Sequence, residues 1–460
     1  MKVNILERFL AKEDGKQLTQ YLAVISATLT LFSVGIYQGW SGPSLVKILS
    51  DEYPIPISQE EASYITIIGS VGHIVGGFLA GFLSDSIGRK LSIISISIPQ
   101  ILSLILIYFS DHSKILLYVA RVLQGIGEGA GISIVPCYIG EIAEPSVRGV
   151  LGVFMAITIS GGSFFTLHEA AIICLIVPLL FLLTFTSMPE SPYFNLMKKD
   201  YEGAKISLQM LRRKNSVEKE LLNLTVDVDR QMSERGNFRD LLANPSNRKA
   251  FMIVSLMRTF QGYTGFGAFV SYNQIMITET TDISPILGSS LLLTVNMIMM
   301  YLSSTYIEKI GRRLLFILSS GLCFSALIFQ AVFLTVRDYT TIDLTFCSWL
   351  PFVIVFFFNI FFCGGLGPGV NIFISEIYST SIKARALCLG SIVFCLTNIG
   401  STKLYQLTAT YIGMAVPFYL FAFITFCGLM FFIWCVPETR GKSLEAIQQE
   451  LKGENKLDLI

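Results

Sequence analysis

Residues 81–90 read Gly-Phe-Leu-Ser-Asp-Ser-Ile-Gly-Arg-Lys, and this stretch decides the fold because a related one follows much later in the chain. Residues 308–313 read Glu-Lys-Ile-Gly-Arg-Arg. Each stretch follows a long apolar run and places a glycine directly before basic residues. At Gly88 the glycine suits a tight turn, because glycine accepts positive φ angles. The two stretches predict an internal repeat.

Two further motif pairs occur in the same order in both halves of the chain. Residues 141–149 read Glu-Ile-Ala-Glu-Pro-Ser-Val-Arg-Gly, and residues 376–385 read Glu-Ile-Tyr-Ser-Thr-Ser-Ile-Lys-Ala-Arg. Residues 189–192 read Pro-Glu-Ser-Pro, and residues 437–441 read Pro-Glu-Thr-Arg-Gly. This order predicts two parallel six-helix repeats. Proteins built in this way bind their substrate between the repeats, near the bilayer midplane.

The composition is that of a protein embedded in a lipid bilayer. Of the 460 residues, 52% are hydrophobic and 15% are charged, whereas a soluble domain carries about 25% charged residues. A bilayer core of about 30 Å needs about 20 apolar residues in a helix, and helices satisfy their own backbone groups in lipid. We expect twelve transmembrane helices, at about residues 18–40, 62–83, 91–109, 115–140, 149–167, 170–188, 250–277, 285–307, 314–336, 346–374, 384–408 and 412–436.

Lysine and arginine indicate the orientation of these helices, because cytoplasmic segments carry an excess of both. With the N-terminus in the cytoplasm, most of the 34 basic residues fall on the inner side. The outer segments then hold only Lys47, Lys114, Arg337 and Lys403. Both chain ends are therefore expected in the cytoplasm.

The predicted helices divide the chain into five parts. These are a cytoplasmic N-terminus (1–20), an N-terminal six-helix bundle (21–188), a cytoplasmic linker with short helices (189–249), a C-terminal six-helix bundle (250–436) and a cytoplasmic tail (437–460). Within the linker, residues 201–213 are expected to be helical. The fifth helix is short, because residues 150–166 give about 26 Å of helix, slightly less than the bilayer core.

Composition also argues against several classes of partner. The net charge of +1 gives no reason to expect nucleic acid. The three histidines are scattered, and nearly all of the nine cysteines lie in apolar runs. Such a pattern predicts no disulfide framework, no metal site and no cofactor.

The three motif pairs resemble those of the sugar-porter family of the major facilitator superfamily, and most closely those of insect facilitated trehalose transporter-like proteins. The resemblance covers essentially the whole chain. It implies an all-α membrane protein with the major facilitator fold and twelve transmembrane helices in two six-helix repeats. It also implies a facilitative transporter of trehalose or a hexose that works by alternating access, is not an enzyme, and is a multi-pass protein of the plasma membrane.

Other functions remain open at this point. A non-transporting sugar sensor or an inactive relative would keep the fold, and the short fifth helix motivates that alternative. A proton-coupled sugar symporter is a second alternative. The first helix, from Tyr21 to Trp40, contains no Asp or Glu. A proton carrier needs a titratable group in its pathway, so this absence favours facilitated diffusion.

The resemblance implies a sugar site on the seventh, eighth and tenth helices. Amide groups and aromatic rings suit sugar hydroxyls and sugar faces. The first glutamine of the family's span-7 motif is kept as Gln261, and the sugar-binding asparagine corresponds to Asn296. The candidate substrate-binding residues are Gln261, Asn296, Tyr263, Tyr272 and Asn371. Packing of polar groups between helices is the alternative explanation for each.

Several positions depart from the family pattern. Gly262 and Gly267 replace a second glutamine and an asparagine, and Asn371 stands where the family has tryptophan. In the tenth helix, Gly364, Gly365, Gly367, Pro368 and Gly369 form a run that breaks a helix and permits bending. We expect this run to be a moving gate.

Acidic and basic residues alternate in the three motif pairs. We expect them to form an inner latch across the two halves, closed when the substrate cavity faces outward. The candidate latch residues are Asp85, Arg89, Glu144, Arg148, Glu308, Arg312, Glu376 and Arg385. Removing one partner of a buried pair is costly. Plain anchoring of basic residues on the cytoplasmic side is the alternative, but anchoring does not need the acids.

Two arginines lie within predicted spans. Arg121 and Glu128 occupy the fourth span, where ionisable groups are expensive and usually face the bundle interior. Arg258 lies in the seventh span, about 12 Å along the helix from Ala250 at 1.5 Å per residue. We expect its long side chain to extend toward the cytoplasmic interface.

Overall fold

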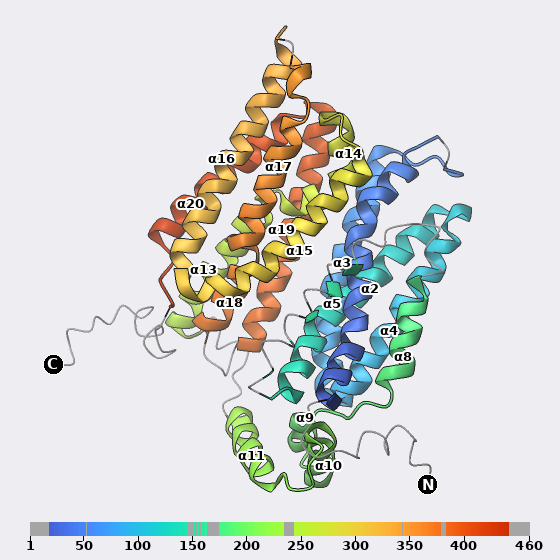
Figure 1. Ribbon diagram of the computed structural model, residues 1–460, viewed down its shortest axis with the longest axis vertical. Helices are drawn as coiled ribbons and strands as arrows, with labels where there is room; N and C mark the ends of the chain where they lie inside the picture. Colours follow the sequence, from blue (N-terminus) through green and yellow to red (C-terminus); the bar gives the residue numbers. More distant parts are fainter. Residues whose placement is uncertain are drawn as a thin grey trace, which may run out of the picture. The chain divides into compact units, whose positions relative to one another are not determined.

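Every described element of the chain is a helix, and no strand occurs among the described residues (Figure 1). The computed structural model describes residues 18–144, 174–233, 243–378 and 383–440 except Glu52 and Asp343, together with Val147, Leu151 and a few positions between 154 and 162. The chain divides into two compact units. Unit 1 comprises Met1–Trp40, Ser50–Ile57 and Ile68–Glu234, and unit 2 comprises Ser41–Leu49, Ser58–Ile67 and Arg235–Ile460.

The first helices of the chain form the core of unit 1. They are α2 (Leu18–Ile48), α3 (Gln59–Ile87), α4 (Arg89–Tyr108), η1 (Ser110–His112), α5 (Lys114–Ile142) and α8 (Ile176–Phe185). In Figure 1, α4 lies beside α5 and α8, and it packs against both. Tyr138 of α5 meets Phe185 of α8 edge to face, with ring centroids 5.4 Å apart. Buried aromatic pairs of this kind stabilise the bundle beyond simple burial.

Glycines bring α3 and α5 into backbone contact. A Cβ atom added at Gly125 or Gly129 would overlap the carbonyl oxygen of Gly69 or His73 on α3. The two glycines of α5 are four residues apart and therefore lie on one face of the helix. This small-residue face allows the close packing that membrane helices use in place of a hydrophobic driving force.

Three short helices continue unit 1 after the membrane-spanning part. They are α9 (Pro192–Met197), α10 (Tyr201–Arg212) and α11 (Glu218–Ser233). The expectation of a helix at 201–213 is thereby confirmed. Asp200 caps α10 by accepting a hydrogen bond from the backbone of Gly203. At the other end of α10, Arg213 donates from Nε to the hydroxyl of Thr19 at 3.1 Å, which ties the linker to the start of α2.

Unit 2 contains the remaining helices. They are α13 (Pro245–Gly262), α14 (Phe266–Thr280), α15 (Pro285–Ile310), α16 (Arg312–Tyr339), η2 (Thr345–Cys347), α17 (Leu350–Phe361), the π-helix η3 (Phe362–Leu366), α18 (Gly367–Ile377), α19 (Lys383–Tyr411) and α20 (Val416–Trp434). α13 packs against α19 and α20, and α16 packs against α17 and α20.

Two predicted spans are interrupted. The seventh span divides into α13 and α14 at Gly265, whose φ of 87° lies in the region that favours glycine. The tenth span passes through the π-turn η3, which includes Gly364 and Gly365 of the predicted gate run. Single π-turns inside α-helices are often found at functional sites.

Hydrogen bonds from neighbouring helices hold the π-turn. Ser319 of α16 donates from its hydroxyl to the Phe361 carbonyl at 2.7 Å and accepts from the Leu366 amide at 3.0 Å. Tyr306 of α15 donates to the carbonyl of Gly364 at 2.5 Å. These bonds satisfy backbone groups that an irregular turn leaves open inside a membrane.

The described residues contain nine helices that are long and apolar enough to cross a membrane. They correspond to predicted spans 1–4 and 8–12. Span 7 is present as α13 and α14, and span 6 is represented by the shorter α8. Span 5, predicted at 149–167, lies largely outside the described residues. The all-helical fold is confirmed, and the count of twelve is confirmed only in part.

Candidate functional site

A buried ion pair organises the turn between α3 and α4. Gly88 has a φ of 97°, and the next residue, Arg89, is only 5% exposed at its side chain. The Nε atom of Arg89 donates to both carboxylate oxygens of Glu141 at 3.1 Å. Asp85 lies 3.6 Å from the same guanidinium. Charged hydrogen bonds to both oxygens fix the geometry of the pair as well as its energy.

The Pro-Glu-Ser-Pro stretch completes this arrangement. The carboxylate of Glu190 accepts from the backbone amide of Lys90 at 3.0 Å. The Ser191 hydroxyl donates to Glu141, so the carboxylate that binds Arg89 also binds the third motif. We call Asp85, Arg89, Glu141, Glu190 and Ser191 the unit 1 cluster.

Unit 2 repeats the arrangement with its own residues. Gly311 has a φ of 94°, and Arg312 donates from Nη2 to Glu376 at 2.6 Å. Glu438 accepts from the backbone amides of Arg312 and Arg313, each at 3.0 Å. The hydroxyl of Thr439 donates to Glu376 at 2.6 Å. We call Arg312, Arg313, Glu376, Glu438 and Thr439 the unit 2 cluster.

The electrostatics of Glu438 follow from its backbone donors. Partial burial alone would raise the pKa of this carboxyl group. The amides of Arg440, Arg312 and Arg313 stabilise the ionised form more strongly, so the pKa is lowered below its ordinary value. Glu438 therefore carries its negative charge at neutral pH.

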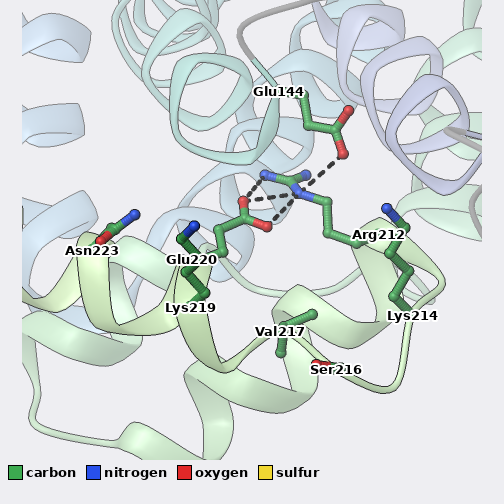
Figure 2. Close-up of a pocket in the computed structure, with 8 residues that line it drawn as sticks. All are labelled: Glu144, Arg212, Lys214, Ser216, Val217, Lys219, Glu220 and Asn223. Carbon is green, nitrogen blue, oxygen red and sulfur yellow. Dashed lines mark hydrogen bonds and ion pairs between the residues drawn. The ribbon is translucent and has the colours of Figure 1, made fainter.

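Glu144 takes part in a separate contact within unit 1. Its Oε1 lies 3.3 Å from Nε of Arg212 on α10, and Glu220 on α11 approaches the same guanidinium to 2.7 Å. Figure 2 shows Arg212 between the two carboxylates. Arg212 also donates to the carbonyl of Ile142 at 2.8 Å. A cavity of about 340 Å³ adjoins this group, lined by Glu144, Arg212, Lys214, Ser216, Val217, Lys219, Glu220 and Asn223.

The pairs described so far each join residues of one unit, so the inner latch remains a prediction. Arg148 lies outside the described residues. The side chains of Glu308 and Arg385 also lie outside the described part of the structure. Glu141 and Arg212 were not among the predicted ion-pair partners, although Glu141 begins the motif that contains Glu144.

A polar centre in unit 2 brings together two of the predicted sugar-site residues. Gln261 of α13 donates from Nε2 to the carbonyls of Leu366 and Gly367, at 3.0 and 2.9 Å. Its Oε1 accepts from Nη1 of Arg258 at 2.8 Å. Nη2 of Arg258 donates to Oδ1 of Asn371 at 2.5 Å. Arg258 therefore links α13 to α18, the helix that begins directly after the π-turn.

The expectation that Arg258 extends to the cytoplasmic interface is wrong. Arg258 is only 5% exposed, and its guanidinium donates to the amide oxygens of Gln261 and Asn371. The ring of Phe394 on α19 lies 5.4 Å from the guanidinium carbon. These partners hold the cation inside the helix bundle, because amide oxygens and an aromatic face replace part of its lost hydration.

A repeated sequence pattern could have indicated this inward orientation. Arg121 and Gln124 on α5 share the spacing Arg-x-x-Gln-Gly with Arg258 and Gln261 on α13. Arg121 donates from Nη1 to Oε1 of Gln124 at 2.6 Å and lies 4.8 Å from the ring of Trp40. The prediction that Arg121 faces the interior and meets polar partners is confirmed.

The predicted site residues Asn296, Tyr263 and Tyr272 lie elsewhere in unit 2. Asn296 accepts from the thiol of Cys363 in the π-turn at 3.4 Å. Tyr272 is buried and stacks on Tyr405, with ring centroids 5.4 Å apart. Tyr263 is half-buried and lies against Gly400 of α19.

The two glycines that replace family amides make room for side chains of α19. A Cβ atom at Gly262 would overlap the hydroxyl of Thr397, and one at Gly267 would overlap Oδ1 of Asn398. Asn398 therefore brings an amide to the place that Gly267 leaves empty. The sequence alone does not reveal the role of Asn398 in filling this place, because Asn398 comes from a different helix.

Comparisons with known proteins agree with this geometry. The family described as "Sugar (and other) transporter" matches residues 21–451. The chain belongs to this family. It is therefore a membrane transporter of the sugar-transporting major facilitators rather than an enzyme, as the motifs predicted.

Similar proteins cover nearly the whole transporter. The facilitated trehalose transporter of Bombyx mori is 28% identical over 443 residues, which span 94% of this chain and 87% of the relative. The facilitated trehalose transporter of Anopheles gambiae is longer: it is 28% identical over 95% of this chain and 56% of its own length. The xylose transporter XylE from E. coli has the same fold, with a TM-score of 0.78 at 18% identity over 94% of this chain and 99% of XylE.

The described residues of the transporter contain no cluster of His, Cys, Asp and Glu that could hold a metal ion. The nine cysteines are free thiols. Gln38 and His73 approach Glu128, with Nε2 of Gln38 at 2.9 Å and Nδ1 of His73 at 3.8 Å from its carboxylate. Glu128 thus has polar neighbours in the middle of α5.

Proposed function

We propose that this sugar transporter is a facilitative carrier that works by alternating access between two six-helix bundles. The observation that carries the proposal is the polar centre of unit 2. Gln261 donates hydrogen bonds to the carbonyls of Leu366 and Gly367 at the end of the π-turn. Asn371, about one turn further along α18, has an exposed side chain. If Gln261 binds the substrate, substrate binding is coupled to bending of the tenth span, because the same side chain bonds to the backbone at the π-turn.

The proposed substrate is a small sugar. The curated relatives are named for trehalose and the similar solved structure for xylose. Trehalose and hexoses are therefore the first substrates to test. We propose Gln261, Asn296, Tyr263, Tyr272 and Asn371 as the binding residues, with Asn398 added from the structure.

The proposed setting is the plasma membrane, with both chain ends in the cytoplasm. The distribution of lysine and arginine supports this orientation. Labelling of single cysteines placed in the segment 189–249 tests it. Modification from outside intact cells would contradict the orientation.

The inner latch is part of this proposal. We propose that Glu144, Arg148, Glu308 and Arg385 join the unit 1 and unit 2 clusters in closing the cytoplasmic side. Arg385→Glu should alter the transport rate, because it reverses one charge at this side. A normal rate with normal surface expression would contradict the latch.

Uptake into proteoliposomes tests the central claim. Radiolabelled trehalose, glucose, xylose and a polyol should be compared at two external pH values, with Gln261→Ala and Asn296→Ala beside the parent. Saturable uptake that is accelerated by sugar on the opposite side, is independent of pH and is reduced in both variants would support a facilitative carrier. Uptake that rises with a proton gradient would instead identify a symporter.

A sugar sensor without transport is the second candidate. The side chain of Gln261 already bonds to Arg258, Leu366 and Gly367 within the protein. An amide that is fully engaged has less freedom to bind sugar. Sugar binding in detergent without uptake in proteoliposomes would favour the sensor.

A further inference from the structure

The charge of Arg258 has no acidic partner among the described side chains of unit 2. Three other arginines with largely buried side chains form ion pairs with carboxylates. Arg89 pairs with Glu141, Arg212 with Glu144 and Glu220, and Arg312 with Glu376. Both hydrogen-bond partners of the Arg258 guanidinium among the described residues are instead neutral amides. A buried charge is costly unless it is paired, and an arginine cannot lose its proton in a protein.

The donors of Arg258 are also only partly used. A guanidinium carries five N–H donors. Nη1 uses one on Gln261 and Nη2 uses one on Asn371. Nε is buried and has no hydrogen-bond partner among the described residues. The guanidinium therefore keeps donors for a ligand that brings its own acceptors.

Asn371 makes this cation reachable. Arg258 is 5% exposed, but the side chain of Asn371 that accepts from its Nη2 is exposed. A ligand that binds at Asn371 therefore comes within reach of the guanidinium behind it. This ligand position lies close to the helix break, because Gln261, which also bonds to Arg258, donates to the carbonyls of Leu366 and Gly367.

We propose that Arg258 binds the carboxylate of the transported substrate, so that the substrate class is an acidic sugar such as a hexuronate. This inference rests on the proposed transport function and narrows its substrate. A carboxylate matches the planar guanidinium with two parallel hydrogen bonds. The sugar hydroxyls would then meet the amides of Asn371 and Asn296, as in the neutral case.

The number of cations selects a carboxylate over a phosphate. Arg258 is the only Lys or Arg in the described part of α13 after Lys249, and α14 and α18 contain none. On α19, Arg385 and Lys403 are each nine residues from Phe394, which is about 14 Å along the helix, and Lys383 is farther away. One cation balances a singly charged carboxylate and leaves a doubly charged phosphate uncompensated.

A matched pair of ligands tests the inference on the unaltered protein. Galacturonate and its methyl ester have the same ring and hydroxyls and differ in the negative charge. In proteoliposomes, galacturonate should inhibit its own labelled uptake at concentrations at least tenfold lower than the ester requires. Equal inhibition by the two ligands would overturn the inference while leaving sugar transport intact.

Two variants locate the charge effect. Arg258→Gln should lower the ratio of galacturonate uptake to methyl ester uptake at least tenfold, because one bidentate charged contact is lost. Arg230→Gln removes an exposed arginine of α11 and should change neither. Thermal unfolding in detergent shows whether Arg258→Gln is folded, and the ligand pair decides the question even if it is not.

Two further outcomes have defined meanings. If no sugar, charged or neutral, is taken up by the parent, the proposed transport function fails and not only its refinement. If neutral sugar uptake requires chloride, is lost when sulfate replaces chloride, and loses that requirement in Arg258→Gln, the partner of Arg258 is an inorganic anion. That result would overturn the carboxylate assignment.

Discussion

At the residue scale, the glycines of α13 and α14 show how one helix can supply what another lacks. Gly262 and Gly267 remove two amides that the resemblance led us to expect, and α19 fills both places with Thr397 and Asn398. Polar side chains therefore remain at these places, but they come from α19 instead of from α13 and α14. Substitution at such a glycine would disturb the packing against α19.

Gly262→Ala should lower the thermal stability of the transporter. The added methyl group would overlap Thr397, and overpacking of a filled interface costs about 1–3 kcal/mol. Thermal unfolding in detergent measures the effect. Gly321→Ala on α16 is the matched control, because a Cβ atom there meets nothing within 4 Å. Equal stability of the two variants would contradict the tight contact between α13 and α19.

Asn398→Ala should weaken sugar binding without unfolding the protein. If Asn398 replaces the missing amide, its removal costs about 0.5–1.5 kcal/mol for one hydrogen bond, or roughly two- to twelvefold in KM. Concentration-dependent uptake measures the change. Ser391→Ala, on an exposed part of the same helix, should leave KM unaltered. An unaltered KM in Asn398→Ala would remove Asn398 from the candidate site.

Glu438 should make stability depend on pH on the acidic side. Its pKa is lowered in the folded protein, so the unfolded chain takes up its proton first as the pH falls. The stabilisation is complete above the ordinary pKa of a glutamate and is lost below it. Glu438→Gln should therefore lose less thermal stability than the parent between pH 6 and pH 4. Equal losses would show that the backbone amides around Glu438 do not favour its ionised form.

At the element scale, the tenth span contains a π-turn that is stabilised by hydrogen bonds from α15 and α16. Ser319 bonds to both ends of the π-turn, and Tyr306 bonds to its middle. The glycine run makes the irregular turn possible, and the bonds from α15 and α16 make it specific. The irregular backbone of the predicted gate is thus held by side chains of two neighbouring helices.

Ser319→Ala should destabilise the transporter more than an ordinary surface substitution. It leaves the carbonyl of Phe361 and the amide of Leu366 without their partner, at about 1–3 kcal/mol for each buried group. Thermal unfolding and uptake are the measurements. Ser325→Ala on the same helix is the control, because that hydroxyl is exposed and bonds only within α16. Matching results for the two variants would show that the π-turn does not need Ser319.

Much of the fold was predictable at this scale, and the polar centre was not. Apolar runs, glycines before arginines and paired motifs are local signals, and they predicted the helices and the turn at Gly88. The contact of Arg258 with Asn371 depends on which face of α18 meets α13. The π-turn inserts an extra residue before α18, and one residue rotates an α-helix by about 100°. No local pattern reveals that rotation.

At the scale of the whole molecule, the two units carry matching charge clusters. In each, a glycine with positive φ precedes an arginine that binds the glutamate at the start of the next motif. A hydroxyl from the third motif binds the same glutamate. Shared geometry in both halves is stronger support for the repeat than the short sequence matches alone.

Arg89→Gln and Arg312→Gln should destabilise the protein by additive amounts. Each leaves a shielded carboxylate without its partner, and breaking a buried pair costs about 3–5 kcal/mol, with the lower end expected for the more exposed Glu376. Effects add when sites share no partners. Unfolding of the two single variants and the double variant measures the sum. A double variant that departs from the sum by more than about 0.5 kcal/mol would contradict the independence of these two ion pairs.

Each charge cluster is assembled from the three motifs of its own half. A gene encoding one bundle would have carried the complete arrangement before it was duplicated, and two identical products could have associated as a homodimer. Fusion of the two copies through a linker then required no new ionic contact at this end. Later divergence could proceed in the polar centre, where Arg258 has no acidic partner among the described side chains, while the ancestral turns stayed intact.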